Sequence, residues 1–473
     1  MADHLWTAQE LVAATGGVLQ GSPGPGFTGV SIDSRSIAPG EIFIAIAGDA
    51  RDGHEFAASA LKAGAGLAIV SRPDDEMRAA GALLVVADPL EALRQMARAA
   101  RERSAARIVA VTGSVGKTST KEALRLVLAP SGEVHASAAS YNNHWGVPLS
   151  LARLPRAARY AVFEVGMNHA GEITPLTQMV RPHVAIITTI APSHLGNFAN
   201  LQGIADAKAE IFAGVVAGGA VLLNRDNAFY DHLAAAARAQ GIARVHSFGR
   251  AEGADVRLEK LVLHAECSCL TASVFGEPVT CKIGTPGEHV ALNSLAVLGA
   301  VDLLGADLAR AALEFGRLAP PKGRGVRHRL KVQNGAFTLV DESYNANPAS
   351  MRAALSVLAR ANTGKHGRRI AVMGDMLELG DESGALHAGL CEAVREFGID
   401  RVYCAGPMMQ KLWDKLTLGE RGHYAPESSG LTESLLAEIA PGDVVMVKGS
   451  LGSRMGPVVE AIRARFAPME QED

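Results

Sequence analysis

The chain contains the stretch Val111-Thr112-Gly113-Ser114-Val115-Gly116-Lys117-Thr118-Ser119, which decides the fold of its central region. The apolar, β-branched run 107–111 predicts a buried strand, and residues 120–128 predict a helix. A glycine loop between a strand and a helix directs backbone N–H groups and the helix N-terminus at anionic oxygens. We therefore predict a phosphate-binding loop, with Lys117 at the β- and γ-phosphates of ATP and the Thr118 hydroxyl on Mg²⁺.

This loop is shorter than the common phosphate-binding pattern, which has another glycine six residues before the lysine. Val111 occupies that position here, so the loop follows the pattern Thr-Gly-x-x-Gly-Lys-Thr. In this respect it resembles the loops of ATP-dependent amide ligases of the cell-wall and folate pathways.

The bulk composition is that of an ordinary globular protein. With 473 residues, the chain is long enough for about three domains. A net charge of −3 and only 5% aromatic residues argue against a nucleic-acid partner. The N-terminus lacks the pattern of a signal peptide, and the longest apolar stretch, 292–304, is too short to span a membrane. We expect a cytoplasmic protein, and nothing in the sequence argues against a monomer.

The cysteines predict a reducing compartment and no disulfide framework, because they are few and odd in number. They are Cys267, Cys269, Cys281, Cys391 and Cys404. The pair Cys267 and Cys269 is too closely spaced for a normal zinc site and alternates like a strand, so we predict that it packs in a core.

The order of predicted elements indicates three α/β domains. Residues 1–104 form a small N-terminal domain that opens with a capping box at Thr7 and Glu10. Residues 105–318 contain the glycine loop and form a doubly wound, mostly parallel sheet. After a linker at 320–325, residues 319–473 form a C-terminal Rossmann-like domain.

In a doubly wound sheet the ligand crevice lies at the carboxyl ends of the strands. Glu164 ends one predicted strand and can hold Mg²⁺ there, although a surface acid is the alternative. His194 follows the predicted strand 186–190, but a lone histidine is more often a hydrogen-bonded loop residue. Lys208 lies on a predicted helix and by itself is typical of a solvated charge.

Polar residues also gather in two other places. Asn142 and Asn143 lie in a turn before an apolar helix, where turn chemistry alone explains them. In the third domain, three predicted strands end in polar groups, which indicates a second substrate-facing surface. The three segments are Asp341-Glu342-Ser343-Tyr344-Asn345-Ala346-Asn347-Pro348, Gly374-Asp375-Met376 and Lys448-Gly449-Ser450. Asn347 and Pro348 also predict the start of a helix.

Over essentially its whole length the chain resembles the Mur ligases of peptidoglycan synthesis. The resemblance lies in the glycine loop, in 341–348 with Ser350-Met351, in 374–380, and in Asp33-Ser34-Arg35 with Gly53-His54 and Phe56. The Asp-Asn-Pro-Arg signature usual in the ligase that adds the third peptide residue is missing from the sequence. The resemblance therefore implies the branch that joins D-alanyl-D-alanine to UDP-N-acetylmuramoyl-tripeptide, through an acyl phosphate made with ATP, in cell-wall biogenesis.

The resemblance also implies roles for individual residues. It implies catalytic roles for Lys117, Glu164, His194 and Lys208. It also implies that two Mg²⁺ ions are bound by Thr118, Glu164, His194 and Lys208. Lys208 matches a lysine that several Mur ligases carbamylate, and a carbamate would supply the anionic oxygens that Mg²⁺ prefers. Nucleotide contacts fall to 113–119, Asn293, Arg324 and Asp341. Substrate contacts fall to Ser34, Arg35, Asn142, Asn143, Tyr344, Asn345 and Asn347.

Two positions depart from the family pattern. His289 is followed by Val290 where the family often has His-Asn, so one adenine contact is missing or replaced. Leu195 is followed by Gly196 where many members have Leu-Glu. Three alternatives stay open: a sister Mur ligase, a folylpolyglutamate-synthase-like ligase, and a nucleotide switch that uses its phosphate loop without making a bond.

Overall fold

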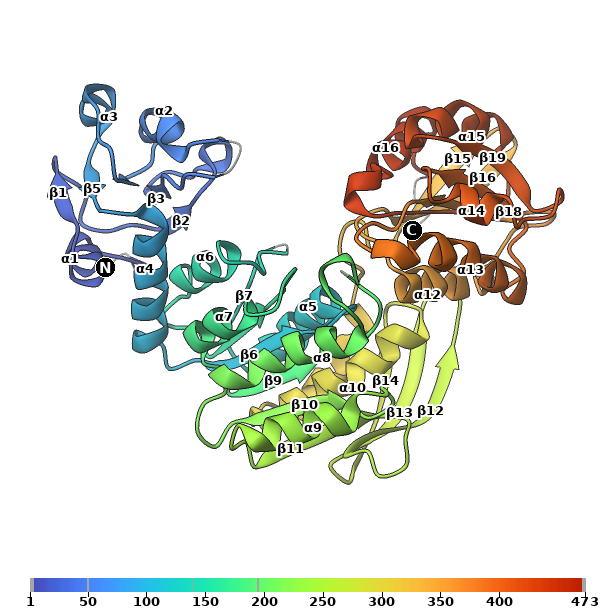
Figure 1. The fold of residues 1–473 in the computed structure, drawn as a ribbon, viewed down its shortest axis with the longest axis horizontal. Coiled ribbons are helices and arrows are strands. Elements are labelled where there is room, and N and C mark those ends of the chain that lie inside the picture. Colours follow the sequence, from blue (N-terminus) through green and yellow to red (C-terminus); the bar gives the residue numbers. More distant parts are fainter. Residues whose placement is uncertain (1–3, 49–50, 139, 194, 470–473) are drawn as a thin grey trace.

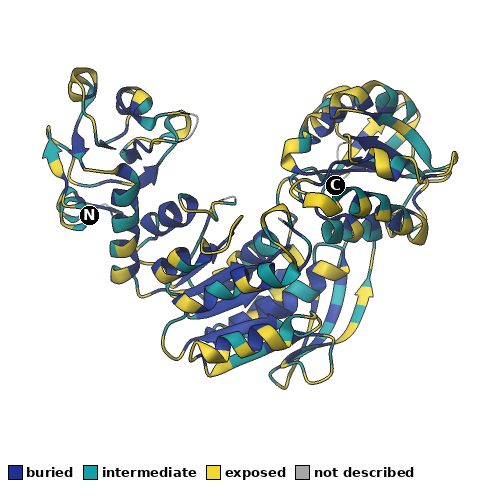
Figure 2. Cartoon of the chain, in the orientation of Figure 1, coloured by how far each residue is buried: buried dark blue, intermediate teal, exposed yellow. Residues whose placement is uncertain are grey.

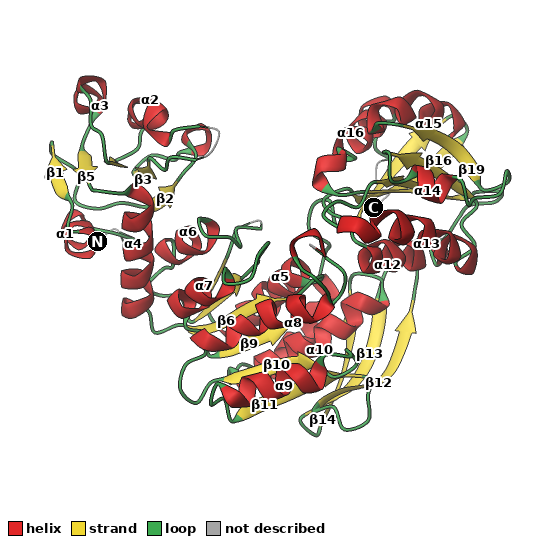
Figure 3. Cartoon of the chain, in the orientation of Figure 1, coloured by secondary structure: helices red, strands yellow, loops and turns green. Residues whose placement is uncertain are grey.

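The structure, a computed structural model, describes residues 4–48, 51–138, 140–193 and 195–469. The chain forms three sheets in succession, of five, nine and six strands. The nine-stranded sheet belongs to the central part (107–314), and the N-terminal part (4–103) and C-terminal part (326–469) stand at opposite ends of it (Figure 1). Helices alternate with strands in all three parts (Figure 3). The predicted α/β fold class is confirmed.

The N-terminal part has the strand order β1-β5-β4-β3-β2, parallel except for the antiparallel pair β1 and β5. Its elements are α1 Ala8–Thr15, β1 Val18–Gln20, β2 Gly29–Ser31, β3 Glu41–Ile44, α2 Ala57–Lys62, β4 Leu67–Val70, α3 Asp75–Ala80, β5 Leu83–Val85 and α4 Pro89–Arg103. The predicted capping box is present, with Thr7 Oγ1 accepting from the Glu10 backbone and the Glu10 carboxylate accepting from the Thr7 backbone.

The central part has the order β14-β13-β12-β11-β10-β9-β6-β8-β7. Its strands are β6 Arg107–Thr112, β7 Val134–Ala136, β8 Tyr160–Glu164, β9 Val184–Ile187, β10 Ala220–Asn224, β11 Arg244–Gly249, β12 Val256–Leu263, β13 Ser268–Val274 and β14 Glu277–Ile283. Its helices are α5 Lys117–Leu128, α6 Gly146–Ala152, α7 Ile173–Val180, α8 Leu201–Ala209, α9 Tyr230–Ala239, α10 Glu288–Leu303 and α11 Leu308–Glu314. The strands from β7 to β12 are parallel, which confirms the predicted mostly parallel sheet, and β12, β13 and β14 form an antiparallel extension.

Helices cover both faces of this sheet. Helices α5, α10 and α11 pack on one face, and α6, α7, α8 and α9 pack on the other. The parallel strands are largely buried between them, whereas the outward helix faces and much of the antiparallel extension are exposed (Figure 2). Because β6, β8 and β9 are parallel neighbours, the loops that follow them lie at the same edge of the sheet.

The C-terminal part has the order β15-β16-β20-β17-β18-β19, parallel except for the β15–β16 hairpin. Its elements are β15 Val326–Val332, β16 Gly335–Glu342, α12 Pro348–Ala359, β17 Arg369–Gly374, α13 Ser383–Glu396, β18 Arg401–Ala405, α14 Gln410–Trp413, β19 Arg421–Ala425, α15 Thr432–Glu438, β20 Val444–Lys448 and α16 Gly456–Arg465. The predicted start of α12 is confirmed, with Asn347 as its N-cap and Pro348 in its first turn.

The N-terminal and central parts share a hydrophobic core. Leu149 and Ala152 of α6 are fully buried in the cluster that fills the N-terminal sheet. Trp6 Nε1 donates to the Ala152 carbonyl at 2.8 Å, and Arg153 Nε donates to the Val30 carbonyl at 2.6 Å. Helix α6 therefore ties the two sheets together through packing and backbone hydrogen bonds.

One prediction about the cysteines is wrong. All five cysteines lie within the described residues and are free, as predicted. In β13, however, Ser268 and Leu270 are the buried residues, and Cys267 and Cys269 are only half-buried. The predicted alternation of the strand is present, but it places the cysteines on the outward face.

Among the described residues, no helix has the length and apolar character needed to cross a bilayer.

The shared core predicts the effect of shortening Leu149. We expect Leu149→Ala to lower the free energy of unfolding by about 2–5 kcal/mol, because it removes buried contacts and leaves a cavity. Chemical denaturation followed by circular dichroism would measure the change. Leu313→Ala is the matched control, because Leu313 is 79% exposed. Equal stabilities of the two variants would contradict the shared core.

Candidate active site

The glycine loop is packed against its neighbours. Gly113 has φ +143° and Gly116 has φ +89°, conformations that favour glycine. A Cβ at Gly113 would overlap Thr188 Oγ1, and a Cβ at Gly116 would overlap Asn293 Nδ2. Helix α5 begins directly at Lys117, with Gly116 at its N-cap. The predicted strand, loop and helix are therefore confirmed, and neither glycine can be replaced without strain.

Two serines of the loop hold backbone groups. Ser114 Oγ donates to the Ala191 carbonyl at 2.8 Å and accepts from the Ala191 N–H at 3.0 Å. Ser119 Oγ donates to the Gly116 carbonyl at 3.0 Å. The Ser114 side chain thus fastens the loop to the segment that follows β9.

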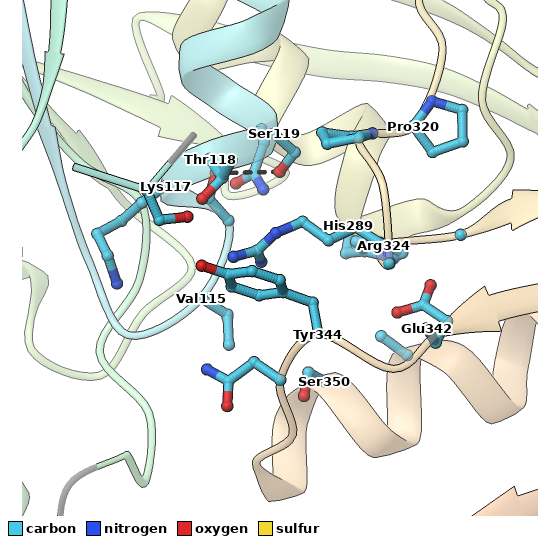
Figure 4. A pocket seen from close by; sticks show the side chains of 18 of the residues that line it. Val115, Lys117, Thr118, Ser119, His289, Pro320, Arg324, Glu342, Tyr344 and Ser350 are labelled. Atoms are coloured by element: carbon cyan, nitrogen blue, oxygen red, sulfur yellow. Dashed lines mark hydrogen bonds between the residues drawn. The ribbon is translucent and has the colours of Figure 1, made fainter. Parts of the chain in front are cut away.

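The ammonium group of Lys117 is folded back onto the loop. Its Nζ donates to the Gly113 carbonyl at 2.8 Å. In Figure 4 this side chain runs away from Arg324 and Tyr344. Burial lowers the pKa of Lys117, the positive charge of Arg324 adds to that effect, and Glu164 opposes it.

Glu164 joins three elements of the central part. It is only 1% exposed, so the alternative of a surface acid is wrong. Its Oε2 accepts from Thr118 Oγ1 at 2.9 Å, and its Oε1 accepts from Asn142 Nδ2 at 2.7 Å. Because Glu164 lies beside Val111 in the β6–β8 register, its carboxylate comes to the base of the glycine loop.

These oxygens suit a hard cation. Mg²⁺ is usually held by one or two carboxylates together with substrate phosphates. Among the described residues, no three histidine, cysteine or acidic side chains gather into a metal site. A cation here would therefore depend on the Glu164 carboxylate, the Thr118 hydroxyl and the oxygens of a bound phosphate.

Lys208 is buried rather than solvated. It lies near the end of α8 and is 1% exposed. Burial lowers its pKa well below the ordinary value, and the charge of Lys117 adds to that effect. The part of the chain that the structure describes offers its Nζ no hydrogen-bond or ion-pair partner. His194, predicted beside it, lies outside the described residues.

A second carboxylate fixes the helix that carries Lys208. Glu210 accepts hydrogen bonds from the backbone N–H groups of Gly171, Ile173 and Thr174, at the start of α7. The end of α8 is thereby attached to the neighbouring helix, which holds Lys208 in place.

A cavity of about 510 Å³ lies between the central and C-terminal parts. It brings together most of the predicted site residues from both parts: the loop 114–119, Glu164, Asn142, Asn143, Asn293, Arg324, Tyr344, Asn345 and Asn347. The Arg324 guanidinium carbon lies 4.4 Å from the centre of the Tyr344 ring (Figure 4). Lys448 Nζ donates to Glu342 Oε2 at 3.1 Å and to the Asn345 carbonyl at 3.0 Å.

Other predicted residues do not line this cavity. Asp341 points into its own turn, where Oδ1 accepts from the Ser343 N–H and hydroxyl. Asp375 accepts from the backbone of Met408 and Met409, so it shapes a loop rather than a substrate surface. The strand ends predicted to face substrate contribute five residues to the lining of the cavity: Glu342, Tyr344, Asn345, Asn347 and Lys448.

Four further predicted residues are not among those that line the cavity. Gly113 accepts a hydrogen bond from Lys117, which does line the cavity, and Lys208 is buried on α8. Ser34 and Arg35 belong to the N-terminal part, where Arg35 forms an ion pair with Asp33 at 2.7 Å. The hydrogen bond from Arg35 lowers the pKa of Asp33 to about 2.

Some cavity residues received no role from the sequence. Glu342 and Lys448 end neighbouring parallel strands, β16 and β20, so the strand-end pattern already contained a signal for them. His289 and Arg327 also line the cavity. Arg327 comes from an edge strand, where no local pattern marks a ligand contact, whereas His289 belongs to the His-Val pair already noted as a departure from the family pattern.

Comparison with known proteins identifies the family. Three family models match: "Mur ligase family, catalytic domain" at 26–101, "Mur ligase middle domain" at 111–301 and "Mur ligase, glutamate ligase domain" at 327–451. A protein of Escherichia coli named UDP-N-acetylmuramoyl-tripeptide–D-alanyl-D-alanine ligase is 34% identical, over 97% of this chain and 98% of its own. The chain belongs to the Mur ligase family. It is a ligase.

Solved structures of Mur ligases share the whole architecture. A crystal structure of MurF from Acinetobacter baumannii superposes with a TM-score of 0.83 at 31% identity, over 97% of this chain and 98% of that one. A MurF ligase from Thermotoga maritima, solved in complex with ADP, superposes with a TM-score of 0.75 at 25% identity, over 92% and 97% of the two chains.

The packing of the Mur ligase loop predicts the effect of one added methyl group. We expect Gly116→Ala to weaken ATP binding at least about tenfold, because φ is positive and the methyl group meets Asn293. Isothermal titration calorimetry would measure the change. Gly389→Ala is the control, because Gly389 is exposed on α13 with no atom within 4 Å of its added Cβ. Unchanged affinity in Gly116→Ala would contradict the assignment of the loop.

Proposed function

We propose that this chain joins D-alanyl-D-alanine to UDP-N-acetylmuramoyl-tripeptide in peptidoglycan precursor synthesis, at the expense of ATP. The observation that supports this most directly is the near-full-length similarity to proteins bearing that ligase name. The cavity adds chemical support, since it combines a phosphate loop, a buried carboxylate and cations from the C-terminal part. The ADP complex of the Thermotoga relative is consistent with a nucleotide in this cavity.

The reaction needs ATP because a carboxylate is a poor electrophile. The terminal carboxylate of the tripeptide attacks the γ-phosphate, which gives an acyl phosphate and ADP. The neutral amine of the dipeptide then attacks the activated carbonyl, and the tetrahedral intermediate collapses to an amide and inorganic phosphate. Positive charge must offset the repulsion between carboxylate and triphosphate.

We assign the residues as follows. Lys117 leaves the Gly113 carbonyl to reach the phosphates, and Arg324 approaches them from the C-terminal side. Glu164 and Thr118 would hold Mg²⁺, which when bound supplies positive charge between the carboxylate and the triphosphate. Asn142 orients Glu164 through its 2.7 Å hydrogen bond. His194 is assigned to a second Mg²⁺.

The remaining assignments follow the order of the chain. Residues 1–104, with Ser34 and Arg35, bind the uridine nucleotide, residues 105–318 bind ATP, and residues 319–473 bring in the dipeptide. Asn293 contacts the nucleotide, and Asp341 contributes to nucleotide binding through the turn that it shapes. Asn143 contacts the muramoyl peptide, and Tyr344, Asn345 and Asn347 contact ATP and the dipeptide. Closure of the C-terminal part about the linker 320–325 protects the acyl phosphate from water.

An acceptor screen tests the reaction. With ATP, Mg²⁺ and UDP-N-acetylmuramoyl-tripeptide, we expect phosphate release with D-alanyl-D-alanine and no comparable release with glutamate or single amino acids. A coupled phosphate assay measures the rate, and Lys117→Ala should abolish it. Release with glutamate would favour a folylpolyglutamate-synthase-like ligase. A rate of ATP hydrolysis that does not change with any acceptor would favour a nucleotide switch.

We propose further that Lys208 is carbamylated. A buried ammonium without a partner is unfavourable, and its lowered pKa favours the neutral amine that reacts with CO₂. The carbamate would present anionic oxygens toward the ions instead of a positive charge. Its test is separate from the acceptor screen.

Removal of CO₂ should therefore lower turnover. We expect activity to fall severalfold in CO₂-free buffer and to recover when bicarbonate is added, because the carbamate forms reversibly. Lys208→Met should lose nearly all activity at any bicarbonate concentration. The wild-type response should strengthen as pH falls, because the protonated amine does not react. A wild-type rate that is independent of bicarbonate over this range would contradict the proposal.

A further inference from the structure

One guanidinium group in the cavity has no bond that accounts for its position. Arg327 lies on β15, opposite Val340 of β16, and lines the cavity. Its Nη2 is buried and has no hydrogen-bond partner among the described residues. Burial lowers the pKa of Arg327, and Glu266 of the central part opposes this without forming an ion pair. A buried donor without an acceptor is unfavourable, so its retention in a cavity points to an acceptor on a ligand.

The surroundings of Arg327 indicate what that ligand offers. The lining of this cavity includes four buried apolar residues, Val290, Leu318, Val340 and Ala354, and Val340 is the strand partner of Arg327. Flat apolar walls with few polar groups are typical of a site for an aromatic ring. Arg327 supplies N–H donors and no acceptor, so the ring must present acceptors toward it.

Helix α10 connects the phosphate loop with the apolar part of the cavity lining. Asn293 contacts Gly116 of the loop, and Val290 lies one turn earlier on α10. One helical turn is about 5 Å, so the apolar walls continue directly from the loop. A nucleotide with its phosphates on the loop can therefore extend its base along α10 toward Val290, in the cavity that Arg327 also lines.

We propose that Arg327 reads the nucleobase, donating from its guanidinium to a ring nitrogen of the adenine of bound ATP. This inference rests on the proposed use of ATP. Adenine offers N1, N3 and N7 as acceptors, whereas its exocyclic amine is a donor that a guanidinium cannot bind. Val290 itself has no polar group, so Arg327, which comes from the C-terminal part, supplies the specificity.

The test compares Arg327→Met with wild type in the full-length protein. Methionine keeps the length of the side chain and removes the donors. We expect the KM for ATP to rise about fivefold or more with kcat nearly unchanged, because only a binding contact is lost. Arg329→Met is the matched control, because Arg329 lies two residues further along β15, is exposed, and is not part of this cavity. It should leave the KM unchanged.

Deaza analogues separate a base contact from a structural effect. We expect wild type to bind one of 1-deaza-, 3-deaza- or 7-deaza-ATP more weakly than ATP, and Arg327→Met to bind that analogue and ATP equally. An unchanged KM for ATP in Arg327→Met, or the same analogue penalty in both proteins, would overturn the proposal. Calorimetric binding of the analogues is measured without the other substrates. A wild type that binds ATP but makes no amide would contradict the ligase proposal and leave this one standing.

Discussion

The hydrogen bond between Thr118 and Glu164 is the interaction on which the site depends. It joins the first turn of α5 to the carboxyl end of β8, and Asn142 occupies the other oxygen of the same carboxylate. It can form only because β6 and β8 are parallel neighbours, with Val111 opposite Glu164. The parallel sheet thus places a buried carboxylate beside a loop that is built to bind anions, an arrangement that a cation between them would stabilise.

The same site contains an excess of buried positive charge. Burial lowers the pKa of both Lys117 and Lys208; the charge of Arg324 adds to this effect at Lys117, and the charge of Lys117 adds to it at Lys208. A bound triphosphate supplies the negative charge that Lys117 and Arg324 need. Lys208 is buried and does not line the cavity, so a change in its own charge removes the unfavourable positive charge more directly. This electrostatic imbalance links nucleotide binding to the proposed carbamate.

The site is also divided between parts of the molecule that are joined very differently. Helix α6 shares a core with the N-terminal sheet, so these two parts act as one body. The C-terminal part supplies Arg324, Tyr344 and Lys448 across a cavity instead. Since the acyl phosphate must avoid water, the more open junction is the one that has to close.

The sequence by itself determined the elements and the phosphate loop, because hydrophobic periodicity, caps and glycine positions act over a few residues. It predicted the strand–loop–helix at 107–128, the start of α12 at Asn347 and the strand ends of the C-terminal part. Only the tertiary structure decided which polar groups meet. Asp341 and Asp375 turned out to shape loops, Lys208 to be buried, and Cys267 and Cys269 to face outward, because burial depends on what packs against an element from a distant part of the chain. Arg327 illustrates the same point, since nothing near it in the sequence reveals that two domains enclose its unpaired donor.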